Sequence, residues 1–410
     1  MTSADAFPSP IEPQGNDFAS GYFRTVQALQ TSLIAVHRTL RIESASSREI
    51  SRQLGVDKSL AWKLSSLVAA EDLRRVAGYV PRSAGARLLI AAIREQGVEA
   101  DLVRNVETAF MEFEAMVHHH AGDRDVLEVM VDGLGASASE GLVKHRKLAF
   151  RGNVGIWGVQ AATRLSSHVL ALDDSGERIR YVQLGALYRF RRHRPGPAWP
   201  LYSFNSYNDD GTLAESRLQP LQQSPGGSES FLIPEFCRGS LPAVSMHNDP
   251  RAPSCEIGDG TLGRCGECDL FFGHLDAESK TAVRDEHNQL GELLCAVNTP
   301  IEMLILDLLV QRELGERIDP TALVYGRATG HPHGAERRDE RSLIPFTEPL
   351  RQLEPGPQMT STQLAPGYME ASDMACRRLG RELEQFTGWR LLLPFPVMPS
   401  AVSLKFRLPS

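Results

Sequence analysis

The sequence has no uncharged apolar run that approaches the length of a membrane-spanning helix. Its N-terminus, MTSADAFPSPIEPQGND, lacks the basic start and apolar run of a secretory signal, so residues 1–17 are expected to be a disordered tail. Only 6 cysteines occur in 410 residues, which excludes a disulfide-dense secreted domain and favours a reducing compartment. These absences predict a soluble cytoplasmic protein with no membrane partner.

Local catalytic signatures are also missing. The sequence contains no GxSxG nucleophile elbow, no P-loop, no GxGxxG after a predicted strand and no HExxH. An enzyme is therefore not the expected class, although catalytic groups that folding brings together would leave no local trace. The acids and histidines of the C-terminal part have no spacing typical of a site and are expected to be scattered solvated charges: Asp276, Glu286, His287, Asp307, His331 and His333.

Positive charge is concentrated in one segment of an acidic chain. The net charge of -7 argues against a protein that lies along nucleic acid over its whole length. From His37 to Arg94, however, 11 Lys and Arg residues stand against 5 Asp and Glu residues, a local excess of 6. The charge needed to approach a phosphate backbone is thus confined to the N-terminal part.

That segment contains REISRQLGVDKSLAWKLSSLV, Arg48–Val68, whose pattern predicts a helix-turn-helix. Gly55 is expected to supply the left-handed residue that ends the first helix, and Asp57 is expected to cap a second helix, Lys58–Val68. An amphipathic pattern over Phe18–Ile42 predicts a scaffold helix behind the motif. The inward-facing positions of the motif recur at helical spacing: Ile50, Leu54, Val56, Leu60, Leu64 and Leu67.

The outer face of the second helix carries short polar, aromatic and basic side chains suited to phosphates and base edges in a DNA major groove. Beyond that helix, Leu73–Val76 and Gly78–Val80 could pair as a short hairpin, a wing that holds its arginines against a phosphate. An equal alternative is a plain loop into a helix that begins at Ala84. The residues expected to face DNA are Arg48, Asp57, Lys58, Ser59, Trp62, Lys63, Ser66, Arg74 and Arg75.

The string EISRQLGVDKSLAWKLSSL resembles the helix-turn-helix core of bacterial winged-helix regulators of the IclR and MarR kinds, which share a Leu-Gly-Val turn and a serine near the start of the recognition helix. The resemblance covers Ser46–Val80 and departs from the family pattern at Ser51, where a small apolar residue is more usual. It implies double-stranded DNA as a partner. The residues that it places against DNA are Asp57, Lys58, Ser59, Trp62 and Lys63.

The rest of the chain divides by its hydrophobic pattern. Helices with apolar faces are expected over residues 98–159, as an extension that could pair two copies of a DNA-binding domain at 18–97. Over residues 160–410, short aromatic or β-branched runs between Gly, Pro, Asn and Asp clusters predict a larger, mainly antiparallel β-rich domain with a few helices. Within it, Leu290–Val310 fits a helix or a strand, and Gly367–Phe386 is expected to be a helix. The expected fold class is α+β.

Three cysteines in CEIGDGTLGRCGEC are candidate metal ligands. Cys265 and Cys268 could place two thiolates on one zinc ion with Cys255 as a third ligand, but the second CxxC of a strong zinc signature is missing. Cys268 also begins an apparent strand and could be only a core residue. The adjacent His118–His120 cannot all face one side of a helix, so a solvated helix end is favoured over a metal site there. The candidates for a fourth zinc ligand are Cys237, His247 and His274.

The run YRFRRHRPGP, Tyr188–Pro197, interleaves basic and aromatic side chains. It fits a strand edge that charge protects from aggregation, and it also fits a nucleic-acid surface. A third interpretation is an anion-binding group made by Arg189, Arg191 and Arg192. The sequence leaves these three interpretations open.

The sequence predicts a cytoplasmic, sequence-specific DNA-binding regulator that works as a one-component switch. Its N-terminal domain would bind DNA, with a homodimer expected on a two-fold operator, and its β-rich part would sense a small-molecule effector or mediate assembly. No cofactor is expected apart from the zinc alternative. The alternative function is an enzyme or small-molecule-binding protein in which the helix-turn-helix is only a structural or protein-contact module.

Overall fold

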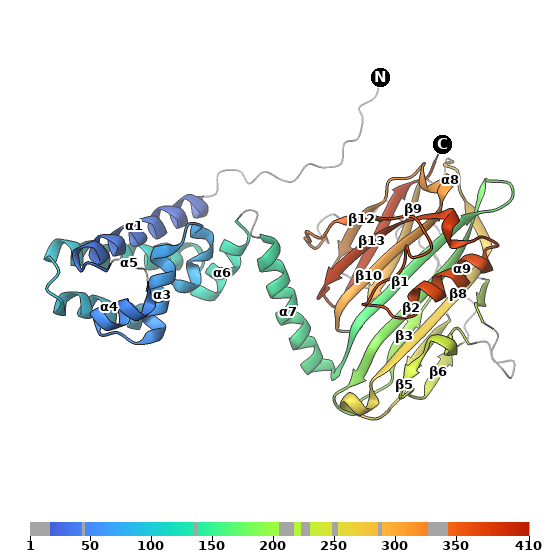
Figure 1. Ribbon diagram of the computed structural model, residues 1–410, viewed down its shortest axis with the longest axis horizontal. Coiled ribbons are helices and arrows are strands. Elements are labelled where there is room, and N and C mark those ends of the chain that lie inside the picture. The colour runs from blue at the N-terminus through green and yellow to red at the C-terminus, as the bar shows by residue number, and fades with distance from the viewer. Residues whose placement is uncertain are drawn as a thin grey trace, which may run out of the picture. The chain divides into compact units, whose positions relative to one another are not determined.

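The computed structural model describes residues 17–42, 46–134, 138–204, 217–222, 230–247, 253–285, 289–326 and 343–409. The chain forms two compact units, 1–142 and 143–410. The first unit is helical and the second is dominated by β-sheet, so the mixed α+β class is confirmed (Figure 1). The expected tail at 1–17 lies almost wholly outside the described residues. Among the helices of the described ranges, none is long and apolar enough to cross a membrane.

The first unit is built from amphipathic helices around one core. The long helix α1 packs along α5, and α2 and α3 form a pair beside them. Apolar side chains at helical spacing on α1, among them Tyr22, Val26 and Leu29, are fully buried, as the sequence pattern predicts for a scaffold helix. The helices are α1 (Asp17–Thr39), α2 (Ser47–Leu54), α3 (Lys58–Ala69), α4 (Ser83–Glu95), α5 (Ala100–His120) and α6 (Arg124–Asp132).

The segment between α3 and α4 does not form the hairpin of a wing. It folds into two 3₁₀ turns, η1 (Leu73–Arg75) and η2 (Ala77–Tyr79). The carboxylate of Asp72 caps η1 by accepting a hydrogen bond of 3.1 Å from the backbone N–H of Arg74. This local bond stabilises a turn where strand pairing would need an extended backbone, so the segment leads directly into α4, as the loop alternative predicts.

The second unit contains one large sheet in the order β12-β13-β10-β1-β2-β8-β4, with β5 also paired to β8 (Figure 1). Its neighbouring strands are antiparallel except for β1 and β10, which are parallel, so the mainly antiparallel prediction is confirmed. The helix α7 (Ala138–Trp157) leads into β1. The strands are β1 (Val159–Leu172), β2 (Arg178–Arg192), β4 (Leu218–Pro220), β5 (Arg238–Gly239), β8 (Cys268–Thr281), β10 (Ile301–Gln311), β12 (Leu350–Leu353) and β13 (Phe386–Pro394).

Two three-stranded sheets, β11-β14-β9 and β3-β7-β6, complete the β structure. The ambiguous segment Leu290–Val310 forms two strands, β9 and β10, separated by a turn. In that turn the Thr299 hydroxyl accepts a hydrogen bond of 2.9 Å from the indole N–H of Trp199, and Pro300 follows it. The bounds of these strands are β3 (Trp199–Ser203), β6 (Val244–His247), β7 (Ser254–Ile257), β9 (Leu290–Val297), β11 (Thr321–Tyr325) and β14 (Ser400–Arg407).

The helix expected over Gly367–Phe386 is shorter in the structure. Helix α9 is Tyr368–Arg378, and Gly380 follows it at φ 76°, a left-handed conformation that ends the helix. A 3₁₀ turn (Leu383–Gln385) then leads into β13 at Phe386. The prediction extended the helix too far because it took Gly388, and not Gly380, as the residue that ends the helix.

The large sheet has a core on each face, because successive side chains of a strand point to opposite sides. On one face, residues such as Leu165 and Ile305 pack with side chains of α9, including Tyr368. On the other face, residues such as Leu304 and Leu308 pack with β3, β7, β9, β11 and β14. The large sheet is thus the middle layer of the unit, between α9 and the two smaller sheets.

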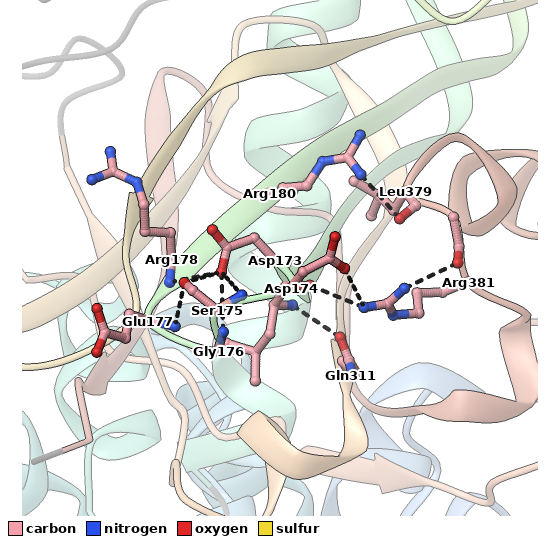
Figure 2. Close-up of polar contacts among 12 residues, drawn as sticks. Asp173, Asp174, Ser175, Gly176, Glu177, Arg178, Arg180, Gln311, Leu379 and Arg381 are labelled. Carbon is pink, nitrogen blue, oxygen red and sulfur yellow. Dashed lines mark hydrogen bonds and ion pairs between the residues drawn. The ribbon is translucent and has the colours of Figure 1, made fainter.

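The turn from β1 to β2 is closed by a carboxylate (Figure 2). Oδ1 of Asp173 accepts hydrogen bonds from the Ser175 hydroxyl at 2.6 Å and from the backbone N–H groups of Ser175 and Gly176 at 3.1 Å each. These bonds, the Ser175 hydroxyl first, lower the pKa of Asp173. The end of β1 is held by Gln311, whose Oε1 accepts a bond of 2.9 Å from the backbone N–H of Leu172. The turn fixes the register of the β1–β2 hairpin on which the central sheet depends.

Candidate nucleic-acid interface

The turn between α2 and α3 has the backbone that the sequence predicts. Gly55 takes the left-handed conformation at φ 65°, and Asp57 caps α3 by accepting bonds from the backbone N–H groups of Ser59 (2.8 Å) and Leu60 (3.0 Å). The hydroxyl of Ser51 donates a hydrogen bond of 2.7 Å to the backbone carbonyl of Val56. The residue that departs from the family pattern therefore holds the turn closed from inside α2.

Helix α1 holds the other end of α3 in place. The side-chain amide of Gln30 donates to the backbone carbonyls of Leu67 (3.1 Å) and Ala70 (2.9 Å), which lie at the end of α3 where carbonyls lack helical partners. The hydroxyl of Tyr22 donates a bond of 2.9 Å to the carbonyl of Leu73. Together with the Asp57 cap at its start, the bonds from Gln30 hold α3 at both ends.

The two sides of α3 differ sharply in burial. The inward residues Leu60, Ala61, Leu64 and Leu67 are all buried, whereas Lys58, Ser59 and Trp62 are exposed and Lys63 and Ser66 are half-buried. At about 100° per residue, these five outward residues occupy an arc of about 140° on one side of the helix. The outer-face prediction made from the sequence spacing agrees with this burial pattern.

Trp62 is an exposed aromatic side chain within that arc. Its side chain is 52% exposed, yet the ring is positioned by Tyr79 of η2, whose ring centre lies 5.3 Å away in an edge-to-face arrangement. A large exposed indole held by a second ring is pre-positioned for contact with a partner. The turns that replace the wing therefore support the outer face of α3.

The basic side chains near α3 fall into two groups. Within the described ranges, Arg48, Lys58 and Lys63 form no ion pair, so their charge is available to a phosphate. In contrast, Arg74 donates two bonds to Asp72, at 2.8 and 3.1 Å, and Arg75 lies 3.9 Å from the same carboxylate. The hydrogen bond from the Arg74 side chain lowers the pKa of Asp72. Of the five basic residues predicted to face DNA, these two arginines have the least free charge.

The candidate zinc cysteines lie in three different surroundings. Cys255 is buried in β7, Cys268 is buried at the start of β8, and Cys265 is exposed in a 3₁₀ turn. Burial raises the pKa of Cys255 to about 11 and that of Cys268 to about 12, which favours the thiol over the thiolate that zinc needs. Within the ranges that the structure describes, no group of three or more His, Cys, Asp or Glu side chains could hold a metal ion. The surroundings favour the core interpretation of Cys268.

The three histidines at the end of α5 fit the interpretation of a solvated helix end. His118 and His119 are exposed, and His120 is half-buried with its ring 5.7 Å from that of Phe18. This is the helix end that the sequence favours. His120 serves as a packing group for α1.

The basic run Tyr188–Pro197 is not a sheet edge, because β2 pairs with β1 on one side and β8 on the other. The edge-protection interpretation is therefore wrong. Arg189 and Arg191 both form ion pairs with Glu267, at 3.2 and 3.4 Å. Arg192 is buried and donates a bond of 2.8 Å to the carbonyl of Ile257. The three arginines thus bind neighbouring groups of the same unit, which leaves little charge for an external anion.

The expectation of scattered solvated charges is wrong for Asp307, which is fully buried in the large sheet. Its carboxylate accepts bonds of 2.9 and 2.7 Å from Arg390 of β13, and the hydroxyl of Tyr368 lies 2.8 Å from both Asp307 Oδ2 and Ser167 Oγ. Burial raises the pKa of Asp307, and the hydrogen bonds from Arg390 oppose that shift. Asp276, at 4% exposed, is likewise buried. Asp307 lies inside a nearly continuous apolar run of β10, a signal that could have indicated its burial.

A second group of polar side chains lies on the opposite face of the same sheet and had no sequence signal. Nδ1 of His168 on β1 forms a hydrogen bond of 2.7 Å with the hydroxyl of Tyr181. The ring of His274 on β8 lies beside the same tyrosine ring. Burial lowers the pKa of both histidines to about 3. Arg164 lies on this face as well. The strand register brings these residues together from segments about 100 residues apart in sequence, so no local pattern marks them.

Comparison with known proteins adds no assignment to this geometry. The sequence matches no protein-family model, and it has no significant match among curated proteins. The site residues themselves therefore carry the functional argument.

Proposed function

We propose that the chain is a sequence-specific DNA-binding transcriptional regulator that inserts α3 into a major groove. The observation that carries the proposal is the outer face of α3, where Lys58, Ser59, Trp62, Lys63 and Ser66 share one arc and face away from the core. Helix α3 has 12 residues and is therefore about 18 Å long. With its side chains, an α-helix is about 10–12 Å in diameter, which fits a major groove about 12 Å wide.

The residues of this face take different parts in the proposal. Lys58 and Lys63 approach phosphates or guanine edges, and Ser59 and Ser66 supply short hydrogen-bonding groups. Trp62 contacts the sugar or a thymine methyl with its apolar surface. Asp57 is occupied by the cap of α3, so its part is to position the helix rather than to touch a base.

The structure has 3₁₀ turns at the place of the wing, so the proposal is a helix-turn-helix regulator without a β-hairpin wing between α3 and α4. Arg48 at the start of α2 is exposed and fits a backbone contact. A homodimer on a two-fold operator, with the β-rich unit as sensor or assembly domain, remains part of the proposal. The proposal includes a cytoplasmic location in a bacterium.

The test is binding of the full chain to the DNA upstream of its own gene over a salt series. The affinity is expected to fall steeply with salt, and Lys63→Ala should weaken binding and reduce the salt slope by about 1. Arg351→Ala, which removes the same charge from an exposed position on β12 of the other unit, is the matched control and should leave binding unchanged. Salt-insensitive binding, or equal effects of the two substitutions, would count against the proposal.

A further inference from the structure

Arg164 of β1 is a cation on the face of the large sheet that packs against the two smaller sheets. Its position on the strand lies between Leu304 of β10 and Leu187 of β2. The guanidinium carbon lies 4.9 Å from the centre of the Phe272 ring, and Nη1 donates a bond of 3.2 Å to the carbonyl of Leu201. In the part of the chain that the structure describes, Arg164 forms no ion pair with a carboxylate, and its Nε is buried without a hydrogen-bond partner.

This arrangement is unfavourable for the folded protein alone. Arginine stays protonated in proteins, so the charge cannot be removed by loss of a proton. A cation surrounded by rings, aliphatic side chains and the Cys295 thiol loses hydration that one carbonyl bond, one ring contact and this thiol replace only in part. An apolar side chain of similar volume would be no less stable there. What the site lacks is an anion.

A second unpartnered polar group lies in the same cluster. His274 is 3% exposed, and its Nδ1 is buried without a hydrogen-bond partner. His168, Gln183 and His274 form one row across β1, β2 and β8, with their side chains on the face that carries Arg164. Burial lowers the pKa of both histidines to about 3, so near neutral pH they offer hydrogen bonds without adding charge.

Aromatic rings connect Arg164 with His274. The ring of Phe204 lies 4.2 Å from that of His274 and 6.0 Å from that of Phe272. Phe272 can lie flat against β2 only because Gly185 faces it, since a Cβ at Gly185 would come within 2.3 Å of the ring. The backbone is thus adapted to place an aromatic surface directly beneath the guanidinium group.

Three of the polar side chains on this face are only partly buried. Arg164, Tyr181 and Gln183 are half-buried, whereas their neighbours Ser166 and His168 are each 1% exposed. The site therefore combines a charge that pairs with no carboxylate in the described residues with an apolar surface.

We propose that Arg164 anchors a binding site for a small monocarboxylate with an apolar or aromatic body. The carboxylate accepts hydrogen bonds from the guanidinium Nε and its remaining N–H groups, and the body lies against the rings of Phe272 and Phe204, within reach of His274. A monoanion matches the single unpaired cation, whereas a dianion would leave uncompensated negative charge in the core. The ligand would be the effector only if the DNA-binding proposal holds, but its binding is measured without DNA.

The experiment is calorimetric titration of the full chain with benzoate, phenylacetate and octanoate, each paired with its neutral amide. At least one carboxylate is expected to bind, with its amide weaker by about tenfold or more. Arg164→Leu should abolish this preference, and Arg164→Lys, which keeps the charge but loses the guanidinium fork, should weaken it. Arg180→Leu is the matched control because that arginine donates to the Leu379 carbonyl of the α9 side.

Urea unfolding without ligand separates binding from a structural role. If Arg164 serves a ligand, Arg164→Leu should unfold at a urea concentration equal to or above that of the wild type. Binding of none of the three carboxylates would overturn the proposal, as would equal binding by Arg164→Leu. A less stable Arg164→Leu with no bound carboxylate in the wild type would assign Arg164 to the fold instead. Loss of DNA binding without loss of carboxylate binding would affect only the regulator proposal.

Discussion

Protonation of His168 and His274 is expected to make the β-rich unit sensitive to acid. Both are buried, and burial lowers the pKa of each to about 3. Because the folded-state pKa lies below the unfolded value of 6.5, the unfolded chain binds more protons. The stability contributed by the neutral histidines is therefore fully present above that unfolded pKa and is lost as the pH falls toward the folded pKa.

The expected size follows from these pKa values. Each histidine lowers the free energy of unfolding by about 1.4 kcal/mol for every pH unit below the unfolded pKa, and the two together lower it by about 2.7 kcal/mol. A fall of about two pH units then removes about 5 kcal/mol, which is comparable to the whole stability of a modest domain. This fall of two units ends at about pH 4.5, above the range in which most carboxylates titrate.

His274→Phe tests this reasoning with little damage to packing. The substitution keeps an aromatic ring beside Phe204, and the Nδ1 that it removes has no partner. Urea unfolding followed by circular dichroism at several pH values should show the pH slope fall by about half. His247→Phe, at an exposed position on β6, is the control and should keep the wild-type slope. A wild-type slope in His274→Phe would refute the assignment of acid sensitivity to the buried histidines.

Two further substitutions test the cap of α3 and the close contact inside the sheet. Asp57→Ala should destabilise the helical unit by about 1 kcal/mol in thermal unfolding and weaken DNA binding. Asp57→Asn, which can still cap α3, should stay near the wild type in both measurements. Equal losses in the two variants would contradict the capping argument. Gly185→Ala should cost about 1–3 kcal/mol because its Cβ would meet the Phe272 ring. Gly152→Ala, where nothing lies within 4 Å of an added Cβ, is its control, and a neutral Gly185→Ala would show that the ring moves freely.

The sequence predicted α2, α3 and the turn between them well because the determinants of these elements are local. Gly55 and Asp57 act through bonds to residues two or three positions away, and helical spacing alone separates the faces of α3. The wing prediction was wrong for a local reason too, since the bond from Arg74 to Asp72 favours a turn.

Only the structural class of the β-rich unit could be predicted from the sequence. The mainly antiparallel character followed from short runs and turn residues, but the partners of each strand did not. Asp307 could be mistaken for a solvated charge because its partner Arg390 lies 83 positions away. The group around Arg164 was missed for the same reason, as its members meet only through the register of β1, β2 and β8.

The pairing of β1 with β10 has a consequence for synthesis of the chain. Ala161 of β1 is the partner of Ile301, 140 positions later, and β9 is completed only by β14, whose Ser400 pairs with Val297. The helical unit, by contrast, closes its core within its own segment. On the ribosome, the helical unit can fold while the strands are still being made. The strand β1 can pair with β2 early, but its other edge must wait for β10, which emerges much later. The order of translation thus leaves strand edges of the β-rich unit unpaired for longer than any part of the helical unit.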